Sequence, residues 1–390
     1  MLKLIKGGEV YSPDNIGKKD ILVTDSKIYS ISDNINADDF PVQIEVIEAE
    51  ESVVVPGFID SHVHIAGGGG EGGFHTRTPA IKLSEITGAG VTTIIGCLGT
   101  DGVTRSGEDL LAKSRALNEE GITSYIYTGS YEFPVKTITG SIKRDIILID
   151  EVIGVGEIAI SDHRSSQPEI VEVKQAAAEA RVGGMLSGKA GIVNLHLGDG
   201  ESKMDYLEKI VEESEIPIKQ FVPTHVNRNP ELLERGIKYA KKGGLVDFTT
   251  STTRSILEDG ETKCSRALNY FLKQGVSIDN ITFTSDGQGS LPEFDEHGNF
   301  TGLTTGKCKS LFREVRDAVL TEGIDLSDAL KVITKNPARN LKLDNKGELV
   351  EGKDADIVIL NKEELTIETV VAKGKKMVEN GKVIREGTFE

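Results

Sequence analysis

The segment VVVPGFIDSHVH, residues 53–64, decides the fold. Continuous runs of β-branched residues such as this one are typical of strands that are buried on both faces of a parallel sheet. Seven further runs follow at intervals of roughly 30 residues, the length of one strand–helix–strand unit. They cover residues 91–97, 123–131, 152–160, 192–197, 218–225, 245–251 and 281–285, and helical patterns lie between them, as at residues 171–181, 203–214 and 230–241. This alternation predicts an α/β fold, a (β/α)8 TIM-like barrel.

The two ends of the chain have a different pattern. Short β-like runs separated by turn residues occupy residues 2–5, 20–24, 26–32 and 43–47, and then residues 356–360, 366–372 and 375–384. Asn380-Gly381 is a typical hairpin turn. Neither end has enough apolar residues to form a domain alone. We therefore expect one small β-sandwich domain built from residues 1–54 and 345–390, and a barrel domain over residues 55–344.

Composition excludes several classes of protein. In 390 residues, 45 Lys and Arg oppose 62 Asp and Glu, and the net charge of −17 argues against a nucleic-acid partner. No apolar run is long enough to span a bilayer, and the first residues lack the apolar core of a signal peptide. Cys97, Cys264 and Cys308 are too few and too scattered for a disulfide framework. We expect a cytoplasmic protein without a membrane partner.

Metal-ligand residues occur where the predicted barrel strands end. His62 and His64 are two residues apart, so on a strand both side chains project to one face. His196 and His225 end the fifth and sixth runs, and Asp286 follows the eighth. The carboxyl ends of all barrel strands open onto one face, so these side chains should converge there. Imidazoles and a carboxylate together favour zinc.

A single carboxylate interrupts the fourth apolar run. Glu157 in this run is costly to bury unless a cation compensates it. The cation is either a basic side chain such as Arg164 or a pair of metal ions that Glu157 bridges, and the converging ligands favour the bridge. The remaining histidines lie in polar loops, where His75 and His163 are close to the expected site and His297 is not.

Two loops near the strand ends stand out. Residues 67–73 are mostly glycine and follow the histidine pair without opening a helix, so they lack the dinucleotide-binding pattern. We expect them to form a tight loop that exposes backbone N–H groups. Residues 287–306 are long and polar, and they are either a lid over the site or a disordered loop.

Motifs at both ends of the barrel resemble those of a known enzyme superfamily. The segment PGFIDSHVH at residues 56–64 is similar to the opening motif of the amidohydrolase superfamily, and NPAR at 336–339 with GKDAD at 352–356 resembles its closing segment. Within that superfamily, nearly the whole chain resembles the isoaspartyl (β-aspartyl) dipeptidases. The distinguishing stretches are residues 67–73, 76–79, 160–165 and 224–228.

The resemblance implies two zinc ions in a barrel with a small β-sandwich. One would be held by His62, His64 and Asp286, and the other by His196 and His225. The family normally bridges its metals with a carboxylated lysine on the fourth strand. Here no lysine lies between Lys143 and Lys174, and Glu157 stands at the matching place. Glu157 therefore becomes the bridging residue that we expect.

The resemblance also implies roles for the other side chains. A metal-bridging hydroxide would attack the β-aspartyl amide bond of a small dipeptide, while Asp286 passes a proton to the leaving amine and Tyr131 donates a hydrogen bond to the oxyanion. Arg164 and Arg228 would bind substrate carboxylates and Glu71 the ammonium group. Thr100 and Ser290 would add hydrogen bonds. The family further implies a large homo-oligomer, such as an octamer.

Two other functions remain open from the sequence. The chain could be another amidohydrolase, of the dihydroorotase, hydantoinase or N-acyl amino acid deacetylase type. It could also be a non-catalytic oligomeric scaffold on the same fold, but a scaffold is expected to have lost metal ligands that are present here.

Overall fold

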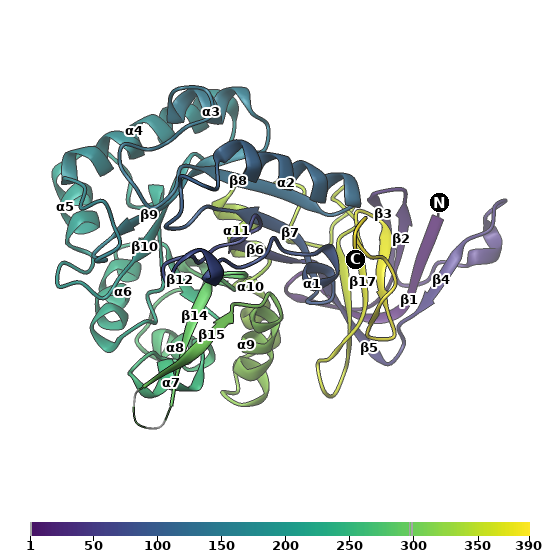
Figure 1. The fold of residues 1–390 in the computed structure, drawn as a ribbon. Helices are drawn as coiled ribbons and strands as arrows, with labels where there is room; N and C mark the ends of the chain where they lie inside the picture. The colour runs from purple at the N-terminus through teal and green to yellow at the C-terminus, as the bar shows by residue number, and fades with distance from the viewer. Residues whose placement is uncertain (1, 296, 298) are drawn as a thin grey trace.

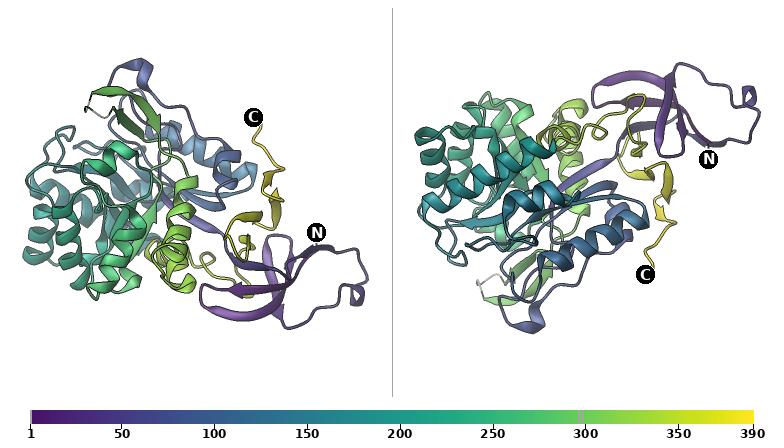
Figure 2. Two further views of the ribbon diagram at one scale, coloured as in Figure 1. Left: turned by 90° about the horizontal axis from the view of Figure 1, so that it is seen from below. Right: turned by 90° about the horizontal axis from the view of Figure 1, so that it is seen from above.

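A computed structural model of the chain describes residues 2–295, 297 and 299–390. It contains a barrel of parallel strands surrounded by helices, with a separate β-sheet beside it (Figure 1). Both chain termini lie in or next to that sheet, as two further views show (Figure 2). The predicted α/β fold with a TIM-like barrel is confirmed.

The barrel consists of eight parallel strands in chain order. Six of them form one sheet and two form a pair: β6 (Phe58–Val63), β7 (Val91–Gly96), β8 (Thr123–Thr128), β9 (Val152–Ile160), β10 (Ile192–Leu197) and β11 (Phe221–Thr224), then β12 (Val246–Thr249) with β13 (Ile281–Thr284). Hydrogen bonds close both seams. Val226 N donates to Asp247 O at 3.2 Å, and Asp286 N donates to His62 O at 3.1 Å. The second bond fixes the first and last strand ends side by side.

Helices cover the outside of the barrel. They are α1 (Leu83–Thr87), α2 (Gly107–Glu120), α3 (Ile142–Leu148), α4 (Ile170–Ser187), α5 (Asp205–Glu213), α6 (Pro230–Lys241), α7 (Arg254–Glu258), α8 (Cys264–Lys273), α9 (Lys309–Leu320), α10 (Leu326–Lys331) and α11 (Lys335–Asn340). Local signals define their ends. The Asn229 side chain accepts from Leu232 N at 2.9 Å before Pro230 begins α6, and Gly188 in a left-handed conformation ends α4. The three helical segments predicted from the sequence correspond to α4, α5 and α6.

Strands from both ends of the chain form the second sheet. They are β1 (Leu2–Tyr11), β2 (Asn15–Thr24), β3 (Lys27–Ser32), β4 (Glu45–Glu48), β5 (Ser52–Pro56), β16 (Ile357–Asn361), β17 (Ile367–Ala372), β18 (Lys375–Glu379) and β19 (Lys382–Val383). Antiparallel pairing of β5 with β16 joins the two ends, and Asn380 and Gly381 make the predicted hairpin between β18 and β19. This sheet has an apolar core of its own. The domain boundaries given above stay a prediction.

The segment after β13 carries a β-hairpin. Strands β14 (Ser290–Phe294) and β15 (Phe300–Thr305) pair antiparallel within the segment that the sequence left as a lid or a disordered loop. Residues 296 and 298 of that segment lie outside the described residues. Whether the hairpin moves as a lid stays a prediction. Among the described residues, no helix is long and apolar enough to cross a membrane.

Candidate metal centre

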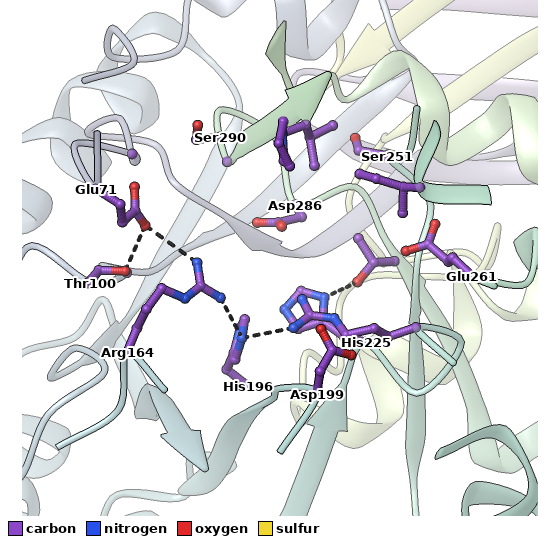
Figure 3. Close-up of a pocket in the computed structure, with 18 of the residues that line it drawn as sticks. Glu71, Thr100, Arg164, His196, Asp199, His225, Ser251, Glu261, Asp286 and Ser290 are labelled. Atoms are coloured by element: carbon purple, nitrogen blue, oxygen red, sulfur yellow. Dashed lines mark hydrogen bonds and ion pairs between the residues drawn. The ribbon is translucent and has the colours of Figure 1, made fainter. Parts of the chain in front are cut away.

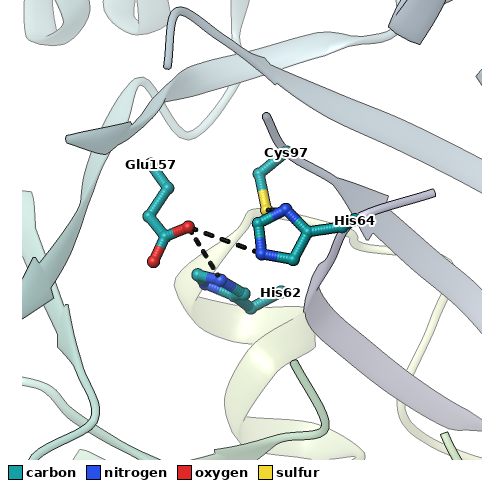
Figure 4. A group of neighbouring side chains, drawn as sticks. All are labelled: His62, His64, Cys97 and Glu157. Atoms are coloured by element: carbon teal, nitrogen blue, oxygen red, sulfur yellow. Dashed lines mark hydrogen bonds and ion pairs between the residues drawn. The ribbon is translucent and has the colours of Figure 1, made fainter. Parts of the chain in front are cut away.

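Four buried side chains from three strands of the six-stranded sheet converge at the mouth of the barrel. His62 and His64 come from the end of β6, Cys97 directly follows β7, and Glu157 lies in β9. One ligand-type atom of each residue lies within 4.8 Å of those of the others. Figure 4 shows the four side chains pointing toward one another, with His62 Nε2 3.3 Å from Glu157 Oε2. We call these four residues the first half-site.

A second group shares the same carboxylate. His196 near the end of β10 and His225 directly after β11 face the other oxygen of Glu157. His196 Nδ1 lies 2.7 Å and His225 Nε2 lies 3.3 Å from Glu157 Oε1. We call Glu157, His196 and His225 the second half-site. Because each half-site uses a different oxygen, Glu157 is placed between them.

A bulge in β9 aims Glu157 at this point. Val155 pairs with Val193 of β10 and Ile158 pairs with Leu195, so β9 holds one extra residue opposite β10. Such a bulge re-aims the side chain that it carries. Gly156 has a φ of 149°, and a Cβ there would lie 2.7 Å from Asn194 O. Only glycine fits before Glu157, since any other residue would be strained and would clash with β10.

The donor atoms of this region fit bound metal ions. His62 Nε2, Glu157 Oε2 and Asp286 Oδ1 are buried, and none has a hydrogen-bond partner within the described part of the chain. A buried carboxylate oxygen without a donor is costly, and a cation removes the cost. Asp286 Oδ1 also lies 3.0 Å from His64 Nε2, so it faces the first half-site. These atoms form a set that two divalent ions would satisfy.

Asp286 and His225 already have the charge states of metal ligands. Burial raises the pKa of Asp286, but the close contact with His64 and the charges of His64 and His62 outweigh burial and lower that pKa to about 2. Burial, His196 and Arg228 lower the pKa of His225 to about 3, so its ring is neutral at neutral pH. Carboxylates that are ionised and imidazoles that are neutral are the forms that bind metals.

In the first half-site, burial lowers the pKa of His62, but the charges of Cys97 and Glu157 outweigh burial and raise it. The charges of Cys97 and Asp286 likewise outweigh burial and raise the pKa of His64. These two rings would therefore release a proton on binding a metal.

Outer hydrogen bonds hold the imidazoles of the second half-site. His196 Nε2 lies 2.9 Å from Asp162 Oδ2, and His225 Nδ1 lies 2.6 Å from Thr249 Oγ1. Partners of this kind fix the ring orientation and the tautomer of a metal-binding histidine.

Asp162 also binds the first of the two predicted arginines. Arg164 Nε donates to Asp162 Oδ1 at 3.0 Å and Arg164 Nη2 donates to Asp162 Oδ2 at 2.7 Å. An ion pair between Arg164 and Glu157, one of the two interpretations of the sequence, is therefore wrong: the guanidinium already has a carboxylate partner. Arg228 Nη1 is 3.9 Å from Asp162 Oδ2, so Arg228 is freer to bind a ligand.

A cavity of about 460 Å³ opens above the two half-sites. Most of the predicted site residues line it: His64, Glu71, Thr100, Tyr131, Arg164, His196, His225, Arg228, Asp286 and Ser290. His62 and Glu157 are buried beside it. Figure 3 shows Glu71 at one end, where Thr100 Oγ1 donates to Glu71 Oε1 at 2.8 Å and Arg164 Nη1 lies 3.6 Å away. Gly69 of the glycine-rich loop also lines the cavity.

Sequence reasoning missed several residues of the site. The sequence indicates for Cys97 only that it is not part of a disulfide framework. Asp162 does have a signal, because it lies within residues 160–165, which carry the family resemblance. Glu261 lines the far end of the cavity, and burial raises its pKa to about 7. The predicted neighbours His75 and His163 are exposed, and neither lines the cavity.

Comparisons with known proteins identify the family and the fold of the chain. The model of the amidohydrolase family matches residues 53–383. The crystal structure of a β-aspartyl dipeptidase from Fervidobacterium islandicum AW-1, in complex with β-Asp-Leu, superimposes with a TM-score of 0.91 at 47% identity, covering 98% of this chain and 97% of that one. A D-hydantoinase structure shares the fold, with a TM-score of 0.69 at 20% identity over 100% and 98% of the two chains. Among curated proteins, the dihydroorotase of Clostridium acetobutylicum is 27% identical over 93% of this chain and 90% of its own length.

Proposed function

Because the chain belongs to the amidohydrolase family, we propose that it is a zinc-dependent dipeptidase that hydrolyses β-aspartyl (isoaspartyl) dipeptides. The observation that carries this proposal is the arrangement of Glu71, Arg164 and Arg228 in the cavity above the two half-sites. The similarity to the enzyme that binds β-Asp-Leu supports the choice of substrate. Assembly into a large homo-oligomer stays a prediction, which the mass of the protein in solution will test.

In this proposal the two half-sites hold two zinc ions. His62, His64 and Asp286 would hold one, His196 and His225 would hold the other, and the Glu157 carboxylate would bridge the two. The imidazole and carboxylate donors favour zinc over magnesium or calcium. Bound zinc supplies Lewis-acid chemistry, because it lowers the pKa of water to about 7 and polarises a carbonyl group.

Asp286 is the proton carrier in this proposal. Its pKa of about 2 keeps the carboxylate ionised at neutral pH, and it lines the cavity beside the first half-site. An ionised carboxylate can accept a proton during attack on the amide carbon and give it to the departing amine. The amine then leaves as a neutral group, and Asp286 returns to its ionised form.

Tyr131 is the hydrogen-bond donor for the developing oxyanion. Burial and the charge of Glu157 hold the pKa of Tyr131 well above its ordinary value, so its hydroxyl keeps its proton. This hydroxyl points at His196 Nδ1, next to the expected metals. A donor placed where negative charge develops typically contributes about 2.7–4 kcal/mol to catalysis.

Substrate recognition uses the remaining charges of the cavity. Glu71 at one end suits the free ammonium group, and the guanidinium of Arg228 suits a carboxylate. Asp162 occupies Nε and Nη2 of Arg164, so Arg164 would bind substrate through Nη1, which also lies 3.6 Å from Glu71 Oε1. A β-linkage leaves the ammonium and a free α-carboxylate on one carbon atom, whereas in an α-linkage the α-carboxyl group forms the scissile amide and the free carboxylate is the one on the side chain. The cavity should therefore reject α-linked dipeptides.

The experiment compares four substrates with zinc-loaded protein. β-Asp-Leu should be hydrolysed, while α-Asp-Leu, dihydroorotate and an N-acetyl amino acid should be poor substrates. Dihydroorotate belongs in the panel because the curated relatives include a dihydroorotase. Equal rates on the α- and β-linked dipeptides, or faster turnover of dihydroorotate, would overturn the proposal.

A further inference from the structure

Cys97 is the fourth donor side chain in the first half-site, and the proposed reaction gives it no role. It directly follows β7, the strand beside β6, and it is fully buried. The other two cysteines have ordinary partners. Cys264 Sγ donates to Thr249 O at 3.0 Å, and Ser285 Oγ donates to Cys308 Sγ. Cys97 Sγ instead lies 3.8 Å from an imidazole nitrogen, His64 Nδ1.

We propose that Cys97 supplies a sulfur ligand to the metal ion that His62 and His64 hold. The inference rests on the metal centre of the proposed function. Its basis is that the sulfur lies within 4.8 Å of a ligand atom of His62, of His64 and of Glu157. Neither ring nitrogen of His62 has a hydrogen-bond partner among the described residues, and Glu157 Oε2 has none either. Several unpartnered donors thus share one buried space with the thiol.

Two separations in the first half-site are close to those between neighbouring ligands of one zinc ion. Tetrahedral zinc with bonds of usual length places a nitrogen and an oxygen ligand about 3.3 Å apart, and a sulfur and a nitrogen about 3.6 Å apart. His62 Nε2 and Glu157 Oε2 are 3.3 Å apart, and Cys97 Sγ and His64 Nδ1 are 3.8 Å apart. In this ring orientation the other nitrogen, His64 Nε2, faces Glu157 Oε2 at 3.8 Å and Asp286 Oδ1 at 3.0 Å, so binding the ion through Nδ1 requires the ring to flip.

The alternative is that Cys97 only orients His64. In that case the Nδ1–H group of His64 donates to the sulfur, and the sulfur lies behind the ring, away from the metal. Its position argues against this role, because a residue behind the ring would face away from Glu157. Cys97 faces the same space as the Glu157 carboxylate (Figure 4).

A sulfur ligand would change which metal the half-site selects. Thiolates are soft ligands that favour zinc, whereas a site of imidazoles and carboxylates alone also accepts manganese. Cys97 would therefore make the first half-site more selective for zinc than the second. We expect Cys97→Ser to lower the preference for zinc over manganese by on the order of tenfold or more.

Cobalt substitution tests the proposal without any substrate. Protein refilled with two equivalents of Co²⁺ should show an intense sulfur-to-cobalt charge-transfer band in the near ultraviolet. Cys97→Ser should abolish the band, while the matched variants Cys264→Ser and Cys308→Ser should keep it. For the unaltered zinc protein, X-ray absorption should detect a sulfur neighbour at about 2.3 Å from zinc. This measurement does not need the variant, so it tests the proposal even if Cys97→Ser does not fold.

The outcomes separate this inference from the proposed function. If fully loaded wild-type protein shows no charge-transfer band and only nitrogen and oxygen around zinc, Cys97 is not a ligand and the inference is overturned. The inference is also overturned if Cys264→Ser or Cys308→Ser, rather than Cys97→Ser, removes the charge-transfer band. Failure to hydrolyse β-Asp-Leu would overturn the proposed function and leave the spectroscopic result unchanged.

Discussion

The two half-sites share Glu157 but differ in what surrounds them. In the first half-site, His62 has no hydrogen-bond partner among the described residues, and Cys97 Sγ lies 3.8 Å from His64 Nδ1. In the second half-site, His196 and His225 are both tied to outer polar groups, Asp162 and Thr249.

This difference indicates that the two half-sites have different roles. The first half-site consists of donors facing one another in a buried space, so it is built to hold an ion. The second is connected through Asp162 to Arg164, and Arg164 reaches Glu71 at the end of the cavity. A change in the first should therefore appear mainly as lost metal, and a change around the second should also alter substrate binding.

The largest expected effect is loss of the shared carboxylate. Glu157→Gln should lower the zinc content below two ions per chain, because two dications lose the charge that reduces their repulsion. The activity on β-Asp-Leu should fall by on the order of 10⁴-fold. Zinc analysis and kcat/KM measure both effects. Glu314→Gln, at another buried glutamate on α9, is the matched control and should keep its metal. Full zinc content in Glu157→Gln would show that Glu157 does not join the half-sites.

Asp286→Asn should separate metal binding from turnover. An amide oxygen can still coordinate, so most of the zinc should remain, but an amide cannot carry a proton at neutral pH. We expect kcat to fall by about 10³-fold, within the usual range for a lost acid–base group. Zinc content and kcat of the same preparation provide the test. Wild-type kcat with both ions bound would mean that Asp286 is a ligand only.

Arg228→Met tests the freer of the two arginines. Because its guanidinium is not paired at close range with Asp162, we expect it to bind the substrate carboxylate, and its loss should lower kcat/KM by about 10²-fold, mainly through KM. Arg235→Met is a control, since Arg235 pairs with Asp205 and Glu208 and does not line the cavity. An unchanged KM in Arg228→Met would remove Arg228 from substrate binding.

A smaller effect is expected from Asp162→Asn, which loosens the link between the second half-site and Arg164. Loss of an outer carboxylate typically lowers metal affinity by about 10- to 100-fold. Here KM should rise as well, because Arg164 loses its anchor. Zinc titration combined with KM distinguishes the outcomes. A rise in KM with unaltered zinc affinity would show that Asp162 positions Arg164 alone.

Much of the site could be predicted because the barrel brings residues at the ends of separate strands together on one face. His62, His64, His196, His225 and Asp286 all end strands or directly follow them, and parallel strands end on one face. Glu157 was conspicuous as a charge within an apolar run, which is costly without a partner.

Other features had no comparable signal. A bulge depends on the register between β9 and β10, and a single sequence does not contain that register. Cys97 is one thiol at the end of an apolar run, where a buried free cysteine is common. The hairpin β14–β15 lies in a polar segment whose strands are mostly not buried, so their alternation is weak.

Reconstitution without dissolved carbon dioxide tests the central claim most directly, namely that Glu157 joins the two half-sites with no carboxylated lysine. Apoprotein should be refilled with zinc in bicarbonate-free buffer and in buffer with added bicarbonate, and zinc content and β-Asp-Leu hydrolysis measured in both. We predict two ions per chain and the same activity in the two buffers. Zinc content and activity that rise strongly with bicarbonate would contradict the account, because a lysine outside β9 would then supply the bridge.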